Sequence, residues 1–281
     1  MHGIASSEKN HMKRIDINEL KQIQLDVLSA IHGFCIEHGI RYSLGCGTML
    51  GCARHQGYIP WDDDIDIYLP REDYNKLVNE FPETLNGKYQ FISLERDSKW
   101  NRAYGKAFDN RTVLRETVSE TVQIGVNIDV FPIDDVPDDE QQWNAYNKTR
   151  VRLQKLYAIK TYSPRSEWSI CKKLGLAMGK LALLAVSSRL LAQTLQKMAV
   201  KHNGKGFRRV FECCQGLFES RSFPFKKSLF DNLKLMPFED REFFGFEDYD
   251  EYLTNCYGDW RQLPPKEKQV ANHIFNAWWK Q

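Results

Sequence analysis

Acidic side chains gather in one short stretch of the chain, where Asp62, Asp63, Asp64 and Asp66 fall within five residues. Residues 64–67 alternate acidic and apolar side chains, which is typical of a strand with one face in the core. On such a strand Asp64 and Asp66 share a face, with their Cα atoms roughly 6.5 Å apart. Two carboxylates this close repel each other, so the pattern predicts a cation between them. Hard oxygen ligands favour Mg²⁺ or Mn²⁺.

A glycine-rich turn precedes these acids by about fifteen residues. Gly47 and Thr48 open a predicted short helix, whose first backbone N–H groups and positive dipole end suit a bound phosphate. A further acid, Asp129, stands alone among apolar residues on a later predicted strand. Together with Asp64 and Asp66 it completes a predicted set of three metal ligands, which are also the candidate catalytic acids.

Phosphoryl transfer depends mainly on positioning and on neutralising charge. Arg54 and Lys106 are the predicted cations for the remaining phosphate charge. His55 follows Arg54 and is a candidate catalytic base or phosphate contact. A calcium loop of the EF-hand type is excluded, because with Asp62 as its first position the sixth would need glycine and holds Ile67.

Bulk properties favour a globular enzyme core over a nucleic-acid-binding protein. The chain has 281 residues, enough for one large or two modest domains. It carries 39 basic and 37 acidic residues, so it lacks the broad basic character typical of nucleic-acid binding. Seven cysteines without a Cys-x-x-Cys pair favour a reduced, cytoplasmic chain.

Hydrophobic periodicity predicts alternating helices and strands around the acids. Asp16 and Glu19 form a predicted capping box for a helix that ends before Gly39. Further helices are predicted over 48–54 and 72–81, and strands over 40–44, 64–69, 89–94, 102–109 and 125–132. The predicted organisation is a disordered or expression-derived tail (1–14), a catalytic core (15–137), a basic helical region (138–205) and an irregular, aromatic-rich C-terminal segment that completes the site (206–281).

The stretch 174–200 within the helical region is rich in Leu and Ala, but Lys180 and Arg189 interrupt it. It is therefore a poor transmembrane candidate. Two interpretations stay open: a helix in the core, or an interfacial helix whose lysines face anionic lipid at the inner face of a membrane.

The run from Gly47 to Ile67, Gly-Thr-Met-Leu-Gly-Cys-Ala-Arg-His-Gln-Gly-Tyr-Ile-Pro-Trp-Asp-Asp-Asp-Ile-Asp-Ile, closely resembles the signature of the LicD family. This family comprises bacterial phosphotransferases that decorate cell-surface glycans and shares its motif with the fukutin-related proteins of animals. Further matches are residues 128–134 (Ile-Asp-Val-Phe-Pro-Ile-Asp), 257–260 (Tyr-Gly-Asp-Trp), 263–265 (Leu-Pro-Pro) and His273.

The resemblance implies an α/β (α+β) fold in which a nucleotidyltransferase-like mixed sheet is flanked by helices, with the helical region added. Thr48 then follows the glycine of the turn, Asp64 and Asp66 are the paired metal ligands, and Asp129 is the third. It also implies transfer of phosphocholine from CDP-choline, or from another CDP-alcohol, to a glycan such as lipopolysaccharide or teichoic acid. The acceptor is then expected to be lipid-linked in some cases, with peripheral membrane contact.

A quaternary ammonium donor group favours aromatic contacts, and Trp61, beside the acids, is the predicted donor-binding residue. Other aromatic candidates near the motifs are Tyr58, Trp100, Tyr104, Tyr257 and Trp260. Two alternatives stay open: a glycosyltransferase that uses the paired acids to hold a nucleotide sugar, and a non-catalytic module that binds nucleotide or glycan.

Overall fold

The computed structural model describes residues 13–115, 122–164, 168–214, 223–270 and 276–280. Its centre is a mixed sheet with strand order β2-β3-β7-β5-β4, extended beside the end of β7 by β8 and β9. Strands β3 and β7 run parallel, and the other neighbours are antiparallel. The predicted mixed sheet flanked by helices is therefore confirmed. The strands span Ser43–Leu44 (β2), Asp66–Pro70 (β3), Tyr89–Ile92 (β4), Gly105–Asp109 (β5), Asn127–Val136 (β7), Arg209–Phe211 (β8) and Phe225–Lys226 (β9).

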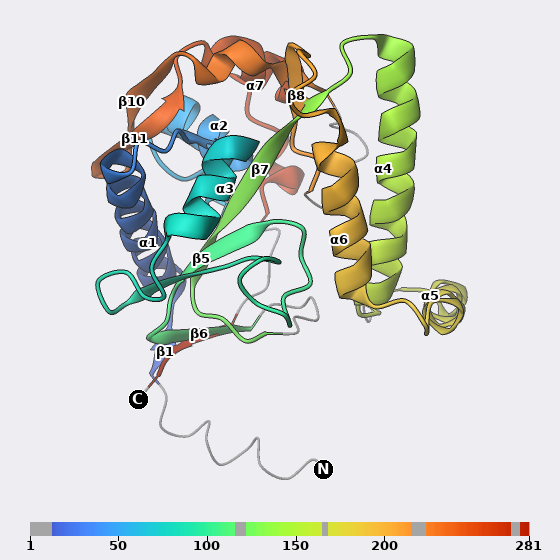
Figure 1. Cartoon of the computed structure of the whole chain (residues 1–281). Coiled ribbons are helices and arrows are strands. Elements are labelled where there is room, and N and C mark those ends of the chain that lie inside the picture. Colours follow the sequence, from blue (N-terminus) through green and yellow to red (C-terminus); the bar gives the residue numbers. More distant parts are fainter. Residues whose placement is uncertain (1–12, 116–121, 165–167, 215–222, 271–275, 281) are drawn as a thin grey trace.

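Three helices of the N-terminal half pack against this sheet: α1 (Ile17–Glu37), α2 (Cys46–His55) and α3 (Arg71–Glu80) (Figure 1). The predicted cap of α1 is present, since the Asp16 side chain accepts a hydrogen bond from the Glu19 N–H. α3 ends directly before Phe81, which is extended because Pro82 follows it. These helices hold in place the strands that carry the predicted acids.

Strand β3 begins at Asp66, two residues later than predicted. Asp64 therefore lies in the loop before the strand rather than on it. The cause is a turn at the start of the acidic run, where the Asp62 N–H donates to the Ile59 carbonyl at 2.8 Å. Asp64 and Asp66 remain neighbours, but the loop and not the strand pleat orients Asp64.

Strand β7 continues through Pro132 to Val136, four residues beyond its predicted end. The Asp129 N–H points to β3, where it donates to the Ile65 carbonyl. Because alternate residues of a strand point their N–H groups to opposite sides, the nitrogen of Pro132 faces the β5 side. β5 pairs with β7 only as far as Val130, so the missing N–H of Pro132 removes no ladder bond.

The predicted helical region consists of α4 (Glu140–Thr161), α5 (Ile170–Ala182), α6 (Ser188–Ala199) and a short 3₁₀ turn, η2 (Val200–His202). α4 and α6 lie side by side, and α5 sits at the end of α4 remote from β8 (Figure 1). The prediction of a core helix over 174–200 is wrong for α5, because α5 buries no residue. It is confirmed for α6, which buries four residues. The stretch breaks because the Ser187 side chain caps a new helix by accepting from the Leu190 N–H.

The described part of the C-terminal segment contains a hairpin and a helix rather than only irregular chain, which corrects the prediction. β10 (Leu233–Phe238) and β11 (Arg241–Phe246) form a hairpin, followed by α7 (Tyr249–Tyr257). Its aromatic residues pack into the main core: the Phe246 ring lies 5.0 Å from that of Phe230 and 5.2 Å from that of Tyr252, and all three belong to the hydrophobic cluster that includes the central sheet. Two short 3₁₀ turns complete this segment, η4 (Lys227–Phe230) and η5 (Lys266–Lys268).

A small separate sheet joins the two ends of the described chain. β12 (Asn276–Trp279) pairs with both β1 (Arg14–Ile15) and β6 (Thr112–Arg115). None of these strands was predicted, because each is short and its partners are far away in the sequence. Of the predicted tail, residues 1–12 lie outside the described residues, as does His273 of the third motif.

Candidate active site

Three charged side chains form a row across the central sheet. Asp66 on β3 is the register partner of Asp129 on β7, and Asp129 is the register partner of Lys106 on β5. Register partners point to the same face of a sheet and lie roughly 5 Å apart. The Lys106 Nζ lies 2.9 Å from Asp129 Oδ1 and donates to Asn127 Oδ1 at 2.9 Å. The structure thus brings three predicted site residues together.

Asp66 is buried, whereas 20% of the Asp129 side chain is exposed. The start of α2 holds the Asp66 backbone: its N–H donates to Thr48 Oγ1 at 2.8 Å, and its carbonyl accepts from the Gly45 N–H at 2.9 Å. Burial raises the pKa of Asp66 well above its usual range, and the carboxylates of Asp64 and Asp129 raise it further. The charged form of Asp66 is therefore costly unless a cation lies beside it.

Asp62, Asp63 and Asp64 form a second acidic group directly before β3. One carboxylate oxygen from each residue lies within 4.8 Å of the others. The Asp62 carboxylate also lies against Gly47, where a Cβ would stand 2.7 Å from Asp62 Oδ2. A larger residue at position 47 would therefore require the Asp62 carboxylate to shift. Asp62 and Asp64 both raise the pKa of Asp66, so the two acidic groups adjoin.

The chemistry of these donors fits a hard divalent cation. All are carboxylate oxygens, which Mg²⁺ and Mn²⁺ prefer. Burial and three neighbouring carboxylates are the main influences that raise the pKa of Asp66, and a cation at this point relieves both. Asp64, Asp66 and Asp129 stay the predicted ligand set. Asp62 and Asp63 offer further carboxylate oxygens next to Asp64, within 4.8 Å of one another, in a group that does not include Asp66 or Asp129.

Gln24 of α1 ties the two acid-bearing segments together. Its Nε2 donates to the Asp63 carbonyl at 3.0 Å and to the Asn127 carbonyl at 3.2 Å, while its Oε1 accepts from the Tyr58 hydroxyl at 3.1 Å. Gln24 is only 5% exposed, so these bonds are shielded from water. No local sequence pattern marks Gln24, because two of its partners lie 39 and 103 residues away.

The C-terminal segment reaches the site through Tyr252 of α7. Its hydroxyl accepts from the Cys46 N–H at 3.1 Å, and Cys46 Sγ lies 2.8 Å from the Tyr68 hydroxyl. Cys46 has a φ of 45°, in the left-handed region that non-glycine residues seldom adopt. These contacts hold that conformation at the start of α2, next to Asp66. Neither Cys46 nor Tyr252 was among the predicted site residues.

Arg54 and His55 lie at the other end of α2, roughly 10–12 Å along the helix axis from Gly47. The Arg54 Nη1 donates to the Trp260 carbonyl at 2.9 Å, and its Nε donates to His55 Nε2 at 3.0 Å. Burial and the charge of Arg54 lower the pKa of His55, so its imidazole is neutral near pH 7. The structure therefore groups these two residues with the C-terminal segment rather than with the acids. Their roles in catalysis and phosphate binding stay predictions.

Trp61 is half-buried and directly precedes the acidic run. Tyr257 is also half-buried, at the end of α7. The remaining aromatic candidates are buried and make other contacts; they are Tyr58, Trp100, Tyr104 and Trp260. Trp61 and Tyr257 are thus the two candidates that keep partly exposed rings.

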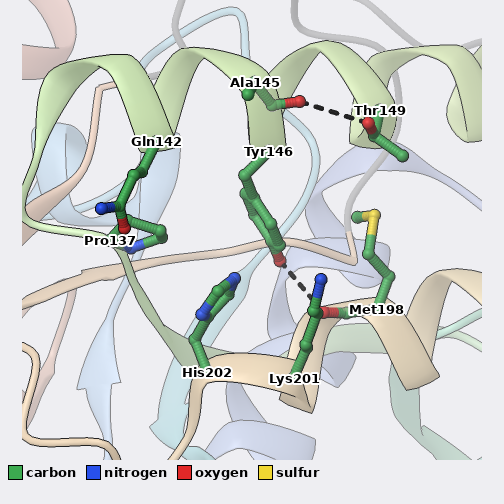
Figure 2. A pocket seen from close by; sticks show the side chains of 8 residues that line it. All are labelled: Pro137, Gln142, Ala145, Tyr146, Thr149, Met198, Lys201 and His202. Atoms are coloured by element: carbon green, nitrogen blue, oxygen red, sulfur yellow. Dashed lines mark hydrogen bonds between the residues drawn. The ribbon is translucent and has the colours of Figure 1, made fainter.

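A cavity of about 390 Å³ lies elsewhere, between α4 and the η2 turn (Figure 2). Tyr146 stands in its wall and donates from its hydroxyl to the Met198 carbonyl at 3.4 Å. Lys201 and His202 line the other side. None of the predicted site residues lines this cavity, so it is separate from the acidic site.

The chain matches known proteins over the region that carries these acids. Residues 39–164 match the family described as LicD/FKTN/FKRP, nucleotidyltransferase domain. Over 274 residues the chain is 29% identical to the lipopolysaccharide cholinephosphotransferase LicD of Haemophilus influenzae, covering 95% of this chain and 99% of that protein. An uncharacterised protein of Rickettsia typhi is 41% identical over 76 residues, 26% of this chain and 25% of that protein. Another from Rickettsia prowazekii is 34% identical over 94 residues, 33% of each chain.

The matched region contains every predicted site residue, from Gly47 to Asp129. The resemblance carried by the motif is therefore confirmed by two independent likenesses, one to the family domain and one along nearly the whole length of a relative. This chain therefore carries, over residues 39–164, a domain that matches the LicD family, and it is similar along nearly its whole length to one LicD protein.

Proposed function

We propose that this chain transfers phosphocholine, or a related phospho-alcohol, from a CDP-activated donor to a hydroxyl group of a cell-surface glycan and releases CMP. The observation that carries the proposal is the pair of neighbouring acids Asp66 and Asp129 beside the start of α2. The full-length likeness to a lipopolysaccharide cholinephosphotransferase supports the same group and acceptor class. CDP-choline is the proposed donor, and lipopolysaccharide or teichoic acid the proposed class of acceptor.

The donor diphosphate is an anion that must approach a group of carboxylates. Two features make this feasible. The first turn of α2, from Gly47 and Thr48, presents the positive end of a helix dipole. A bound Mg²⁺ or Mn²⁺, held by Asp64, Asp66 and Asp129, would neutralise phosphate charge and stabilise the negative charge that develops on the leaving oxygen. Thr48 has a second task, because its hydroxyl fixes the backbone of Asp66.

In the proposed reaction the acceptor oxygen attacks the phosphorus that bears choline. The bond from this phosphorus to the phosphate oxygen of CMP breaks, and its electron pair leaves with CMP. The hydroxyl proton passes to Asp129, whose carboxylate is more accessible than that of Asp66. Lys106 holds one oxygen of Asp129 at 2.9 Å, and the other oxygen is the proposed proton acceptor.

Choline carries a quaternary ammonium group, which aromatic faces bind. Trp61 is the proposed contact, because its ring is partly exposed and its neighbour Asp62 belongs to the acidic group. We propose that the reaction takes place in the cytoplasm, at the inner face of the membrane when the acceptor is lipid-linked.

The test is calorimetric binding of CDP-choline, CDP-ribitol, CDP-glycerol and UDP-glucose to the full chain, each with and without Mg²⁺. We expect Mg²⁺-dependent binding of CDP-choline, followed by CMP release when bacterial glycan is added. Asp64→Asn should lose the Mg²⁺ dependence, whereas Asp240→Asn, at an exposed acid of the β10–β11 turn, should behave as the unaltered chain. Binding of UDP-glucose alone would instead indicate a glycosyltransferase, and donor binding without CMP release on any acceptor would indicate a binding module.

A further inference from the structure

Helix α5 turns a row of large apolar side chains toward solvent. Four of its residues and one that follows it are 59–74% exposed: Ile170, Leu174, Met178, Leu181 and Leu184. Their spacing of three or four residues places them on one side of the helix. A soluble helix normally buries such a stripe. Here we call these five residues the α5 apolar face.

The opposite side of α5 is the one that contacts the protein. A Cβ at Gly179 would stand 2.9 Å from Ile159 Cγ2 of α4, so the glycine permits a close approach between the two helices. The Lys160 Nζ also donates to the Leu183 carbonyl at 2.8 Å, directly after α5. α5 thus rests on α4 through its smallest side chain and points its largest apolar ones outward. The outward orientation is therefore part of the fold.

The positive charge of the chain is concentrated in the stretch 141–211, which includes α5. From 141 to 211 there are 15 Lys and Arg residues against one acid, Glu167, a net charge of +14. The whole chain has a net charge of +2, so the remaining residues sum to 2 − 14 = −12. Lys172, Lys173 and Lys180 stand on α5 itself. An apolar face within a strongly basic region complements a surface with an anionic outer layer and an apolar layer beneath it.

We propose that the α5 apolar face docks on an anionic lipid bilayer, with its side chains in the acyl boundary and the lysines of α5 near the headgroups. Among the described residues no helix is both long and apolar enough to cross a bilayer, so α5 would lie on the surface. A second copy is a poorer occupant, because a symmetric contact brings the lysines of two α5 helices together. One helix also buries less area than a stable dimer interface requires, about 1,200–2,000 Å².

The experiment is flotation of the full chain with vesicles of phosphatidylglycerol and phosphatidylcholine, compared with vesicles of phosphatidylcholine alone. We expect binding to the anionic vesicles that weakens as salt rises. Met178→Glu with Leu181→Glu should reduce the bound fraction at least about tenfold, by placing charges in the apolar layer. The matched control is Ile36→Glu, which alters an aliphatic residue 57% exposed on α1 and should leave binding unchanged.

A second pair of variants separates charge from apolar contact. Lys172→Gln with Lys173→Gln should weaken binding several-fold at low salt and less at high salt, while Lys148→Gln, in the middle of α4, should weaken it less. The proposal is overturned if anionic vesicles do not bind at low salt. It is also overturned if sedimentation reveals a dimer that Met178→Glu dissociates, or if heparin binds the chain and vesicles do not. These outcomes do not depend on CMP release, so the membrane contact and the proposed reaction are tested separately.

Discussion

The two ends of strand β7 carry acids in opposite electrostatic surroundings. At the start, Asp129 lies beside Asp66, whose pKa is raised by burial and by three other carboxylates. Five residues later, Asp134 is fully buried, yet the Arg71 guanidinium donates to both its oxygens, at 2.8 and 2.6 Å. Asn203 adds a third donor at 2.7 Å.

The same side chain on the same strand therefore has two different uses. At the far end the acid is matched by donors and holds α3 against β7. At the near end the acids crowd around Asp66 although Lys106 pairs with Asp129, and this crowding costs stability unless a further cation joins them. We therefore assign the crowded acids to the candidate site and the acid that is paired with Arg71 to the structural framework. Four substitutions can break or sharpen this contrast.

The largest expected effect is on activity, from Asp66→Asn. The fold should be as stable as before or slightly more so, because one of several repelling charges is removed. CMP release should fall at least about a thousandfold, equivalent to about 4 kcal/mol of transition-state stabilisation. Turnover and the urea midpoint of the same preparation provide the measurement. Activity within tenfold of the unaltered chain would exclude Asp66 from the metal site.

Asp134→Asn should have the opposite signature. It leaves the buried Arg71 guanidinium without its counter-charge, and breaking such a pair costs about 3–5 kcal/mol of unfolding free energy. Urea unfolding measures this loss, with Asp240→Asn as a control at an exposed acid. Turnover per folded molecule should stay near that of the unaltered chain. A large loss of turnover without loss of stability would mean that both ends of β7 serve the reaction.

Both acids of the row could be predicted from sequence because alternation and an isolated acid within an apolar strand are local signals. Their partners could not. The pairing of Lys106 with Asp129 depends on the register between β5 and β7, which no local pattern specifies. The C-terminal hairpin was missed because its many aromatic residues hide the alternation of β10 and β11. The outward face of α5 was left undecided, since an apolar stripe looks the same whether it is buried or exposed.

Gln24→Leu should have an intermediate effect. It removes both donors that join the carbonyls of Asp63 and Asn127, so the two acidic segments are no longer held together. We expect kcat/KM to fall roughly 10–100-fold and the Mg²⁺ concentration for half-maximal activity to rise. The free energy of unfolding should also fall, by about 1–3 kcal/mol. Gln22→Leu, on the exposed side of the same helix, is the matched control. An unchanged Mg²⁺ requirement would limit Gln24 to a structural role.

The smallest expected effect is a pH dependence of stability at the matched end of β7. Glu212 follows β8, whose Phe211 is the register partner of Asp134. Burial raises the pKa of Glu212 to about 8, and the nearby Arg150 only partly offsets this. Between about pH 4.5 and pH 8 the folded chain keeps a proton that the unfolded chain has released. Stability should therefore fall as pH rises through this window and level off above it.

Glu212→Gln removes this titration while keeping the shape and the hydrogen-bonding capacity of the protonated acid. Each unit of pKa shift corresponds to about 1.4 kcal/mol of unfolding free energy, so the loss of stability between pH 5 and pH 9 is at most several kcal/mol. Because the protein relaxes around the charge, we expect a loss of about 1–2 kcal/mol. The variant should thus gain stability relative to the unaltered chain at pH 9 and differ little from it at pH 5. Glu140→Gln, at an exposed acid paired with Arg209, should produce almost no change at either pH. If Glu212→Gln instead lowers stability most at pH 9, Glu212 is a charged partner of Arg150. Both acids at the far end of β7, Asp134 and Glu212, would then be paired with an arginine.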